Sequence, residues 1–180
     1  MGWTFKLHAA VAAGLGTMLL SLAALTWLPG LLPLSGAHWL EGAGFASAFV
    51  TCVSAFARLA LTGAAKGSVW LAFRCLPGKV QWAFGALAVG GVALLAFSTL
   101  HETHLQSAVM KDGRYVAFDR TPGSRGQVEI SRSRYEEVRE DDQRTALAIP
   151  GMLCLGAAYA ALTAGELRRA DRAVNRADIT

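Results

Sequence analysis

Asp, Glu, Lys and Arg are missing from three long stretches of the sequence, and this absence indicates the class of protein. None of these residues occurs in 7–40, 80–100 or 145–165. About 18 or more consecutive apolar residues are enough to cross the hydrocarbon core of a bilayer as a helix. A core helix of a soluble protein would keep a polar face, which these stretches lack. The sequence therefore indicates an integral membrane protein.

Cysteine is also scarce, and its placement argues against a disulfide framework. Cys52 and Cys154 fall inside apolar stretches, Cys75 lies in a basic loop, and the most polar segment has no cysteine. We expect them to act as small apolar residues in helix contacts. The chain has 17 Lys and Arg against 13 Asp and Glu, but no basic face interleaved with aromatic residues. We therefore expect no nucleic-acid partner.

Four membrane-spanning helices are expected. The first is longer than the apolar core of a signal peptide, about 7–15 residues, so we expect it to be retained. The second contains Arg58 about one turn from its end, where the side chain can reach the headgroups. Pro150 predicts a kink near the start of the fourth. The expected spans are about 7–28, 42–61, 80–100 and 145–165.

Small residues within the spans predict which helix faces make contact. Ala86 with Gly90, and Gly156 with Ala160, form pairs four residues apart that let another helix approach closely. Between the second and third spans, the apolar segment 68–73 is too short to cross and is expected to lie at the membrane surface.

The 44 residues 101–144 form the polar part of the chain, with eight Lys or Arg and nine Asp or Glu. Residues 114–118 and 127–131 read as two strands around a Pro-Gly turn, so a β-hairpin is expected. Ser133 and Glu136 fit a capping box, which predicts a helix from about Arg134 that continues toward span four. The expected fold class is an all-α membrane protein with a small β-hairpin and helix insertion between helices three and four.

Basic residues in the short loops predict the orientation. The first loop, 29–39, has no Lys or Arg, whereas the second loop and the tail 166–180 are basic. We expect the protein to lie in the plasma membrane. Because basic loops stay in the cytoplasm, both of its termini are expected on the cytoplasmic side. With the N-terminus in the cytoplasm, the chain lies outside after its first and third spans. The domain 101–144 follows the third span and is therefore expected to be extracytoplasmic.

Metal-capable residues gather near one end of the expected spans. Histidine and carboxylate side chains suit zinc or copper. His101 and His104 are three apart, unlike the spacing of four found in a metalloprotease helix. We therefore expect solvated interfacial residues, no metal and no cofactor. The weak candidates are His38, Glu41, His101, Glu102 and His104.

No catalytic motif is present: the chain has no Walker loop, no Gly-x-Ser-x-Gly elbow and no paired CxxC. We therefore expect no enzymatic activity, and a membrane protein that recognises a partner through its outer domain, of an immunity, accessory or envelope-assembly kind. The partner is expected to be a second copy or another membrane or envelope protein. The expected contact residues are Tyr115, Phe118 and Tyr135. A small oligomeric channel or transporter, and a metal-binding or sensory protein, are the alternatives.

Overall fold

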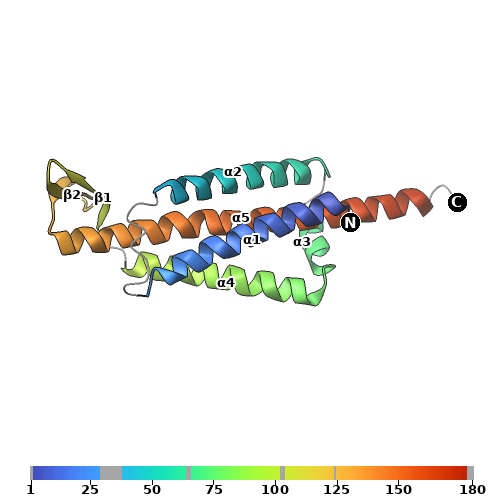
Figure 1. Ribbon diagram of the computed structural model, residues 1–180. Helices are drawn as coiled ribbons and strands as arrows, with labels where there is room; N and C mark the ends of the chain where they lie inside the picture. Colours follow the sequence, from blue (N-terminus) through green and yellow to red (C-terminus); the bar gives the residue numbers. More distant parts are fainter. Residues whose placement is uncertain (1, 29–37, 64–65, 102–103, 124, 178–180) are drawn as a thin grey trace.

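Four long helices dominate the fold (Figure 1). The computed structural model describes residues 2–28, 38–63, 66–101, 104–123 and 125–177. Within these ranges four helices are long and apolar enough to cross a membrane, in agreement with the four predicted spans. The first three start and end within a few residues of the predicted limits, whereas the fourth extends well beyond both limits of the predicted span. Their bounds are α1 Trp3–Leu25, α2 His38–Ala60, α4 Gly78–His101 and α5 Arg132–Ala177.

The helix α5 is the central element of the fold. It contacts each of the other helices, and α1 lies along it most extensively. In Figure 1, α2 and α4 lie on opposite sides of the α1–α5 pair. With 46 residues, α5 is roughly 70 Å long at the rise of an α-helix. Because the hydrocarbon core is only about 30 Å thick, α5 must extend beyond it.

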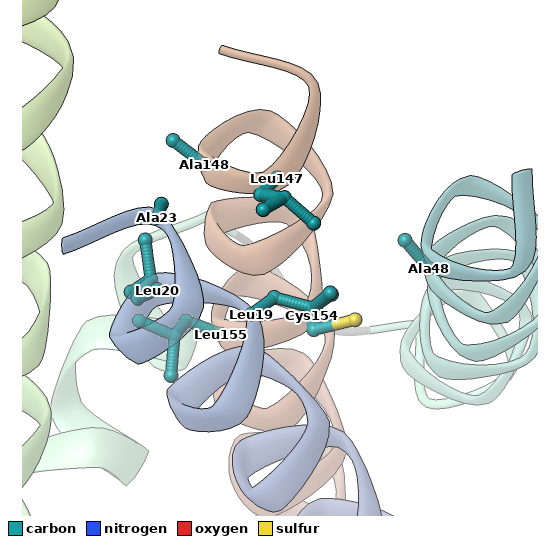
Figure 2. Packing of buried hydrophobic residues seen from close by; sticks show 8 residues of the cluster. All are labelled: Leu19, Leu20, Ala23, Ala48, Leu147, Ala148, Cys154 and Leu155. Carbon is teal, nitrogen blue, oxygen red and sulfur yellow. The ribbon is translucent and has the colours of Figure 1, made fainter. Parts of the chain in front are cut away.

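Leucine side chains and small residues fill the contact between α1 and α5. Leu19 and Leu20 of α1 pack against Leu147 and Leu155 of α5, and Ala48 approaches from α2 (Figure 2). A second cluster nearer the start of α1 consists almost entirely of alanine. Small residues let helix backbones approach closely, which is a main source of helix association in lipid. This second cluster comprises Ala9, Ala12, Ala55, Ala157, Ala158, Ala160 and Ala161.

The two central helices come very close together at Gly16 and Gly151. A methyl group on Gly16 would lie 2.9 Å from the Gly151 carbonyl oxygen, which is closer than real side chains come. The predicted contact pairs are only partly confirmed. Ala160 is buried, but no described atom lies within 4 Å of a side chain built at Gly90 or Gly156.

The segment after α2 forms a short helix, α3 (Lys66–Arg74). Its Phe73 ring lies 5.0 Å from the Tyr159 ring of α5, so one side of α3 packs on the bundle. Trp70 and Leu71 are exposed. The amide of Gln81 donates hydrogen bonds to the carbonyls of Arg74 and Leu76, which fixes the turn into α4. The position of α3 relative to the membrane surface stays a prediction.

The polar segment forms three strands instead of the predicted two. They are β1 (Leu105–Lys111), β2 (Arg114–Asp119) and β3 (Gly126–Glu129), paired antiparallel in the order β1-β2-β3. The predicted hairpin is the β2–β3 pair, whereas β1 was not predicted. A third strand gives the sheet the size that a lone hairpin lacks for stability in water.

The helix α5 runs without interruption from the sheet into the apolar stretch, as predicted (Figure 1). It remains one helix through Pro150, whose side chain is fully buried. The predicted capping residue is wrong. The Ser131 hydroxyl, and not that of Ser133, accepts the hydrogen bond from a first-turn amide, Arg134 N–H, at 3.3 Å. The helix starts at Arg132, earlier than predicted, so Ser133 already lies within its first turn.

Candidate functional site

The polar part of the structure consists of the three strands and the first turns of α5, residues 132–144, which we call the sheet module. Asp112 and Gly113 join β1 to β2 in a two-residue turn, and both have positive φ, 50° and 76°. Such a turn matches the right-handed twist of the strands. This Asp-Gly pair produces the unpredicted strand, because it lets the chain before it fold back along β2.

The side chains of β2 divide between two sheet faces. Tyr115 and Ala117 alternate with Val116 and Phe118, because successive residues of a strand point to opposite sides. The register places Val128 of β3 opposite Ala117 and therefore on the same face. The sheet thus has an inner face next to α5 and an outer face turned away from it.

The inner face packs on α5. Ala117 is 1% exposed, and Val138 of α5 is fully buried. The rings of Tyr115 and Tyr135 lie 4.9 Å apart, and Arg139 donates a hydrogen bond to the Tyr135 hydroxyl. Tyr115 and Tyr135, two of the predicted contact residues, are therefore half-buried against each other.

The outer sheet face carries the apolar side chains of Val109, Val116 and Phe118, which the described structure leaves partly exposed. The register places polar residues, Gln106, Gln127 and Glu129, beside them on the same face. Val109 is 50% exposed and Phe118 is 39% exposed. Val109 pairs with Val116 across the strands, so these side chains adjoin. Charged side chains lie around them, including an Arg114–Glu129 ion pair at 3.5 Å. Phe118 was predicted as a contact residue. Val109 was missed together with its strand, and the Asp-Gly turn signal could have identified it.

Two hydrogen bonds fix the start of β1, one to α5 and one within the sheet. The Ser107 amide donates to the Asp142 carboxylate of α5 at 2.8 Å. Ser107 has a φ of 53° and lies in an irregularity of the β1–β2 pairing, so its amide is turned out of the ladder. The Arg120 amide donates to the His104 carbonyl at 2.8 Å and closes this end of the sheet. A cavity of about 280 Å³ lies beside this attachment, lined by residues that include Gln106, Asp142 and Ser98.

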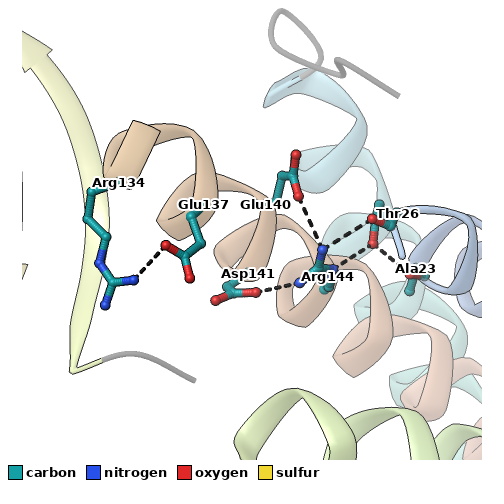
Figure 3. A network of polar contacts seen from close by, with 7 residues as sticks. All are labelled: Ala23, Thr26, Arg134, Glu137, Glu140, Asp141 and Arg144. Carbon is teal, nitrogen blue, oxygen red and sulfur yellow. Dashed lines mark hydrogen bonds and ion pairs between the residues drawn. The ribbon is translucent and has the colours of Figure 1, made fainter. Parts of the chain in front are cut away.

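Arg144 joins the sheet module to the end of α1 (Figure 3). Its guanidinium donates to the Thr26 hydroxyl and to the Thr26 carbonyl, both at 3.2 Å. It also pairs with Asp141 and with Glu140, and its Cζ lies 4.3 Å from the centre of the Trp27 ring. The Arg144 side chain is only 11% exposed. One arginine therefore connects α1 with the polar turns of α5.

Further ion pairs on the module are solvent-exposed. Arg132 pairs with Glu136, and Arg134 with Glu137 (Figure 3 shows the second). The hydrogen bond to the Glu136 carboxylate raises the pKa of the Arg132 guanidinium, which is charged at any physiological pH. Exposed pairs of this kind contribute little to stability.

The metal-capable residues do not form a recognisable centre in the part of the chain that is described. No group of three or more His, Cys, Asp or Glu side chains there could hold a metal ion. Glu41 is half-buried in the first turn of α2, and His104 is exposed at the start of β1. Glu102 and the side chains of His38 and His101 lie outside what the structure describes.

Comparison with known proteins identifies no relative. No protein-family model, no curated protein and no solved structure matches the chain.

Proposed function

We propose that this is a non-catalytic protein of the plasma membrane that recognises a protein partner through its sheet module on the extracytoplasmic side. The observation that carries the proposal is the outer sheet face. It combines apolar side chains at its centre, Val109 and Phe118, with charged side chains around them. Apolar centres with polar rims are typical of protein interfaces.

The attachment of the module supports this proposal. The inner face packs on α5, and α5 continues into the membrane-spanning stretch without a break. Arg144 further links the module to α1. A contact surface held in this way loses little conformational freedom when a partner binds, which favours affinity.

The partner can be a second copy of the chain or another membrane or envelope protein. The apolar helix α4 is little buried in the described structure, so its free sides would face either lipid or another protein in the membrane. A small oligomeric channel is the alternative function. The centre of the described bundle is filled by leucine and alanine, so such a channel would need its pathway between subunits.

The proposed orientation places both termini in the cytoplasm. Arg125 is exposed between β2 and β3, and Cys75 is exposed between α3 and α4. In intact cells, a membrane-impermeant maleimide should label Arg125→Cys in a Cys75→Ser background. It should label the native Cys75 only after the membrane is permeabilised. The reverse pattern would place the sheet module in the cytoplasm and contradict the proposal.

The two faces of the sheet should respond differently to a charge. Tyr115→Asp removes the ring contact with Tyr135, so we expect a loss of about 1–2 kcal/mol and roughly tenfold faster amide exchange in the strands. Phe118→Asp changes an exposed side chain on the other face, so exchange should stay unchanged. Hydrogen-exchange mass spectrometry of both variants measures this difference.

Charge substitutions on the outer sheet face also test the function. Phe118→Asp and Val109→Asp should fold but should no longer co-purify from native membranes with the partner or second copy that accompanies the unaltered chain. Glu136→Ala, an exposed change on the module's helix, serves as the control. Full retention of the partner by both outer-face variants would contradict the proposal.

A further inference from the structure

A cavity lined by arginine lies at the opposite end of the bundle from the sheet module. It has a volume of about 330 Å³ and is formed between the first turns of α1 and the later turns of α5. Arg168, Arg169 and Arg172 contribute to its lining, together with Gly2 and Phe5 of α1.

A fourth arginine approaches the same place from α2. The Cζ of Arg58 lies 5.0 Å from the centre of the Phe5 ring, and the Cζ of Arg168 lies 5.4 Å from it. Arg58 also donates a hydrogen bond to the Thr4 carbonyl at 3.1 Å. Guanidinium groups from two helices, α2 and α5, therefore lie around one buried ring of α1.

The carboxylates on this part of α5 offset only part of the charge. Glu166 lies 3.6 Å from Arg169, and Asp171 is an exposed residue between Arg169 and Arg172. Four guanidinium groups against two carboxylates leave an excess of positive charge beside the cavity. An anion in the cavity would meet this excess of positive charge, so its binding would stabilise the arrangement.

The cavity lies at the level where the apolar stretches end. The uncharged stretch of α5 ends at Gly165, which lines the cavity, and α1 begins at Trp3. Trp3 is 74% exposed, as is typical of indole rings at the lipid headgroups. Lipid phosphates are concentrated at this level of a membrane.

An apolar groove continues from the cavity. It has a volume of about 380 Å³, lies between α3 and α5, and shares Arg169 and Ala173 with the cavity lining. Leu71 of α3 and Leu167 of α5 line it. A phosphate next to a glycerol backbone and acyl chain matches this order of polar and apolar surface.

We propose that the cavity binds the phosphate of an anionic phospholipid, with the start of an acyl chain in the groove between α3 and α5. Arginine is suited to this because its planar guanidinium can donate two parallel hydrogen bonds to one phosphate. Basic pockets between membrane helices are known to hold such headgroups. The site is separate from the sheet module and does not depend on the function proposed for it.

The test measures lipid binding to the purified full chain in detergent by native mass spectrometry. The probes are phosphatidylglycerol, phosphatidylcholine and free glycerol 1-phosphate. We expect phosphatidylglycerol to bind much more tightly than the other two. Arg172→Gln should weaken its binding about fivefold, and Arg168→Gln with Arg172→Gln about 25-fold. Arg132→Gln, at the far end of the same helix, should leave binding unchanged.

Arg172→Gln keeps the test decisive if the double variant unfolds, because no contact of Arg172 holds the helices together among those described. Equal binding of phosphatidylglycerol and phosphatidylcholine would overturn the proposal, as would unchanged binding in Arg172→Gln. If glycerol 1-phosphate binds as tightly as phosphatidylglycerol, the cavity is a site for free phosphate esters and the lipid assignment is wrong.

Discussion

Replacing Arg144 with alanine should lower the free energy of unfolding by about 2–4 kcal/mol. The change removes two hydrogen bonds to Thr26 and the stacking on Trp27. It also takes a cation away from Asp141, whose side chain is only 20% exposed. Losing one partner of a shielded ion pair is costly because the remaining charge stays poorly solvated. Unfolding of the purified protein by sodium dodecyl sulfate measures the effect.

Two control variants separate the causes. Arg132→Ala removes an ion pair of the same helix whose arginine side chain is 76% exposed, and it should leave the free energy of unfolding nearly unchanged. Arg144→Lys keeps the positive charge but lacks the planar guanidinium that can donate several hydrogen bonds at once. Its free energy of unfolding should therefore lie between those of the unaltered protein and Arg144→Ala. If Arg144→Ala proves as mild as Arg132→Ala, the link between the sheet module and α1 is not important for stability.

Gly16→Ala should destabilise the protein by about 1–3 kcal/mol, although alanine is the better helix former. The new methyl group would lie 2.9 Å from the carbonyl oxygen of Gly151 and 3.2 Å from the Leu155 side chain. A backbone oxygen cannot rotate away, so the two helices must separate and lose contacts along the crossing. The measurement is again unfolding by sodium dodecyl sulfate.

Gly14→Ala is the matched control in the same helix. No described atom lies within 4 Å of a side chain built there, so this change should be neutral or should stabilise by up to about 1 kcal/mol. Equal effects of the two substitutions would show that α1 does not approach α5 at Gly16.

Three of the membrane helices could be predicted because each contains a long uncharged stretch that is apolar on every side, and such a stretch is stable mainly in lipid. The helix α2 could be predicted because Arg58 lies near its end, where the side chain can reach the headgroups. The continuous helix from the sheet module into the fourth span could also be predicted, because no helix-breaking signal separates them before Pro150. The exact residue at which α5 starts could not be predicted. Ser131 and Ser133 are both suitable capping residues, and the choice depends on where β3 ends.

The strand β1 was missed because its sequence, Leu-Gln-Ser-Ala-Val-Met-Lys, lies only a few residues after a membrane helix and alternates poorly. Its Ser107 irregularity shifts the alternation within the strand. The contact between α1 and α5 was missed for another reason. Gly16 and Gly151 are far apart in the sequence. The sequence alone does not distinguish them from a glycine with open surroundings, such as Gly90.

Of the predicted site residues, Phe118 lies on an exposed face, whereas Tyr115 and Tyr135 share a contact with each other. Strand alternation correctly separated Tyr115 from Val116 and Phe118. Which of these faces would meet α5 could not be decided from the sequence, since both carry apolar residues. Ala117 decides it in the structure, because its small side chain allows the helix to come close.

Site-specific photo-crosslinking in intact membranes tests most directly whether the outer sheet face binds a protein partner. A photoreactive residue would be placed at Val109, at Phe118 and, as a control, at Glu136. The proposal predicts one adduct of the same mass from Val109 and Phe118, with none from Glu136. No adduct from the two outer-face positions, or an equal yield from Glu136, would contradict it.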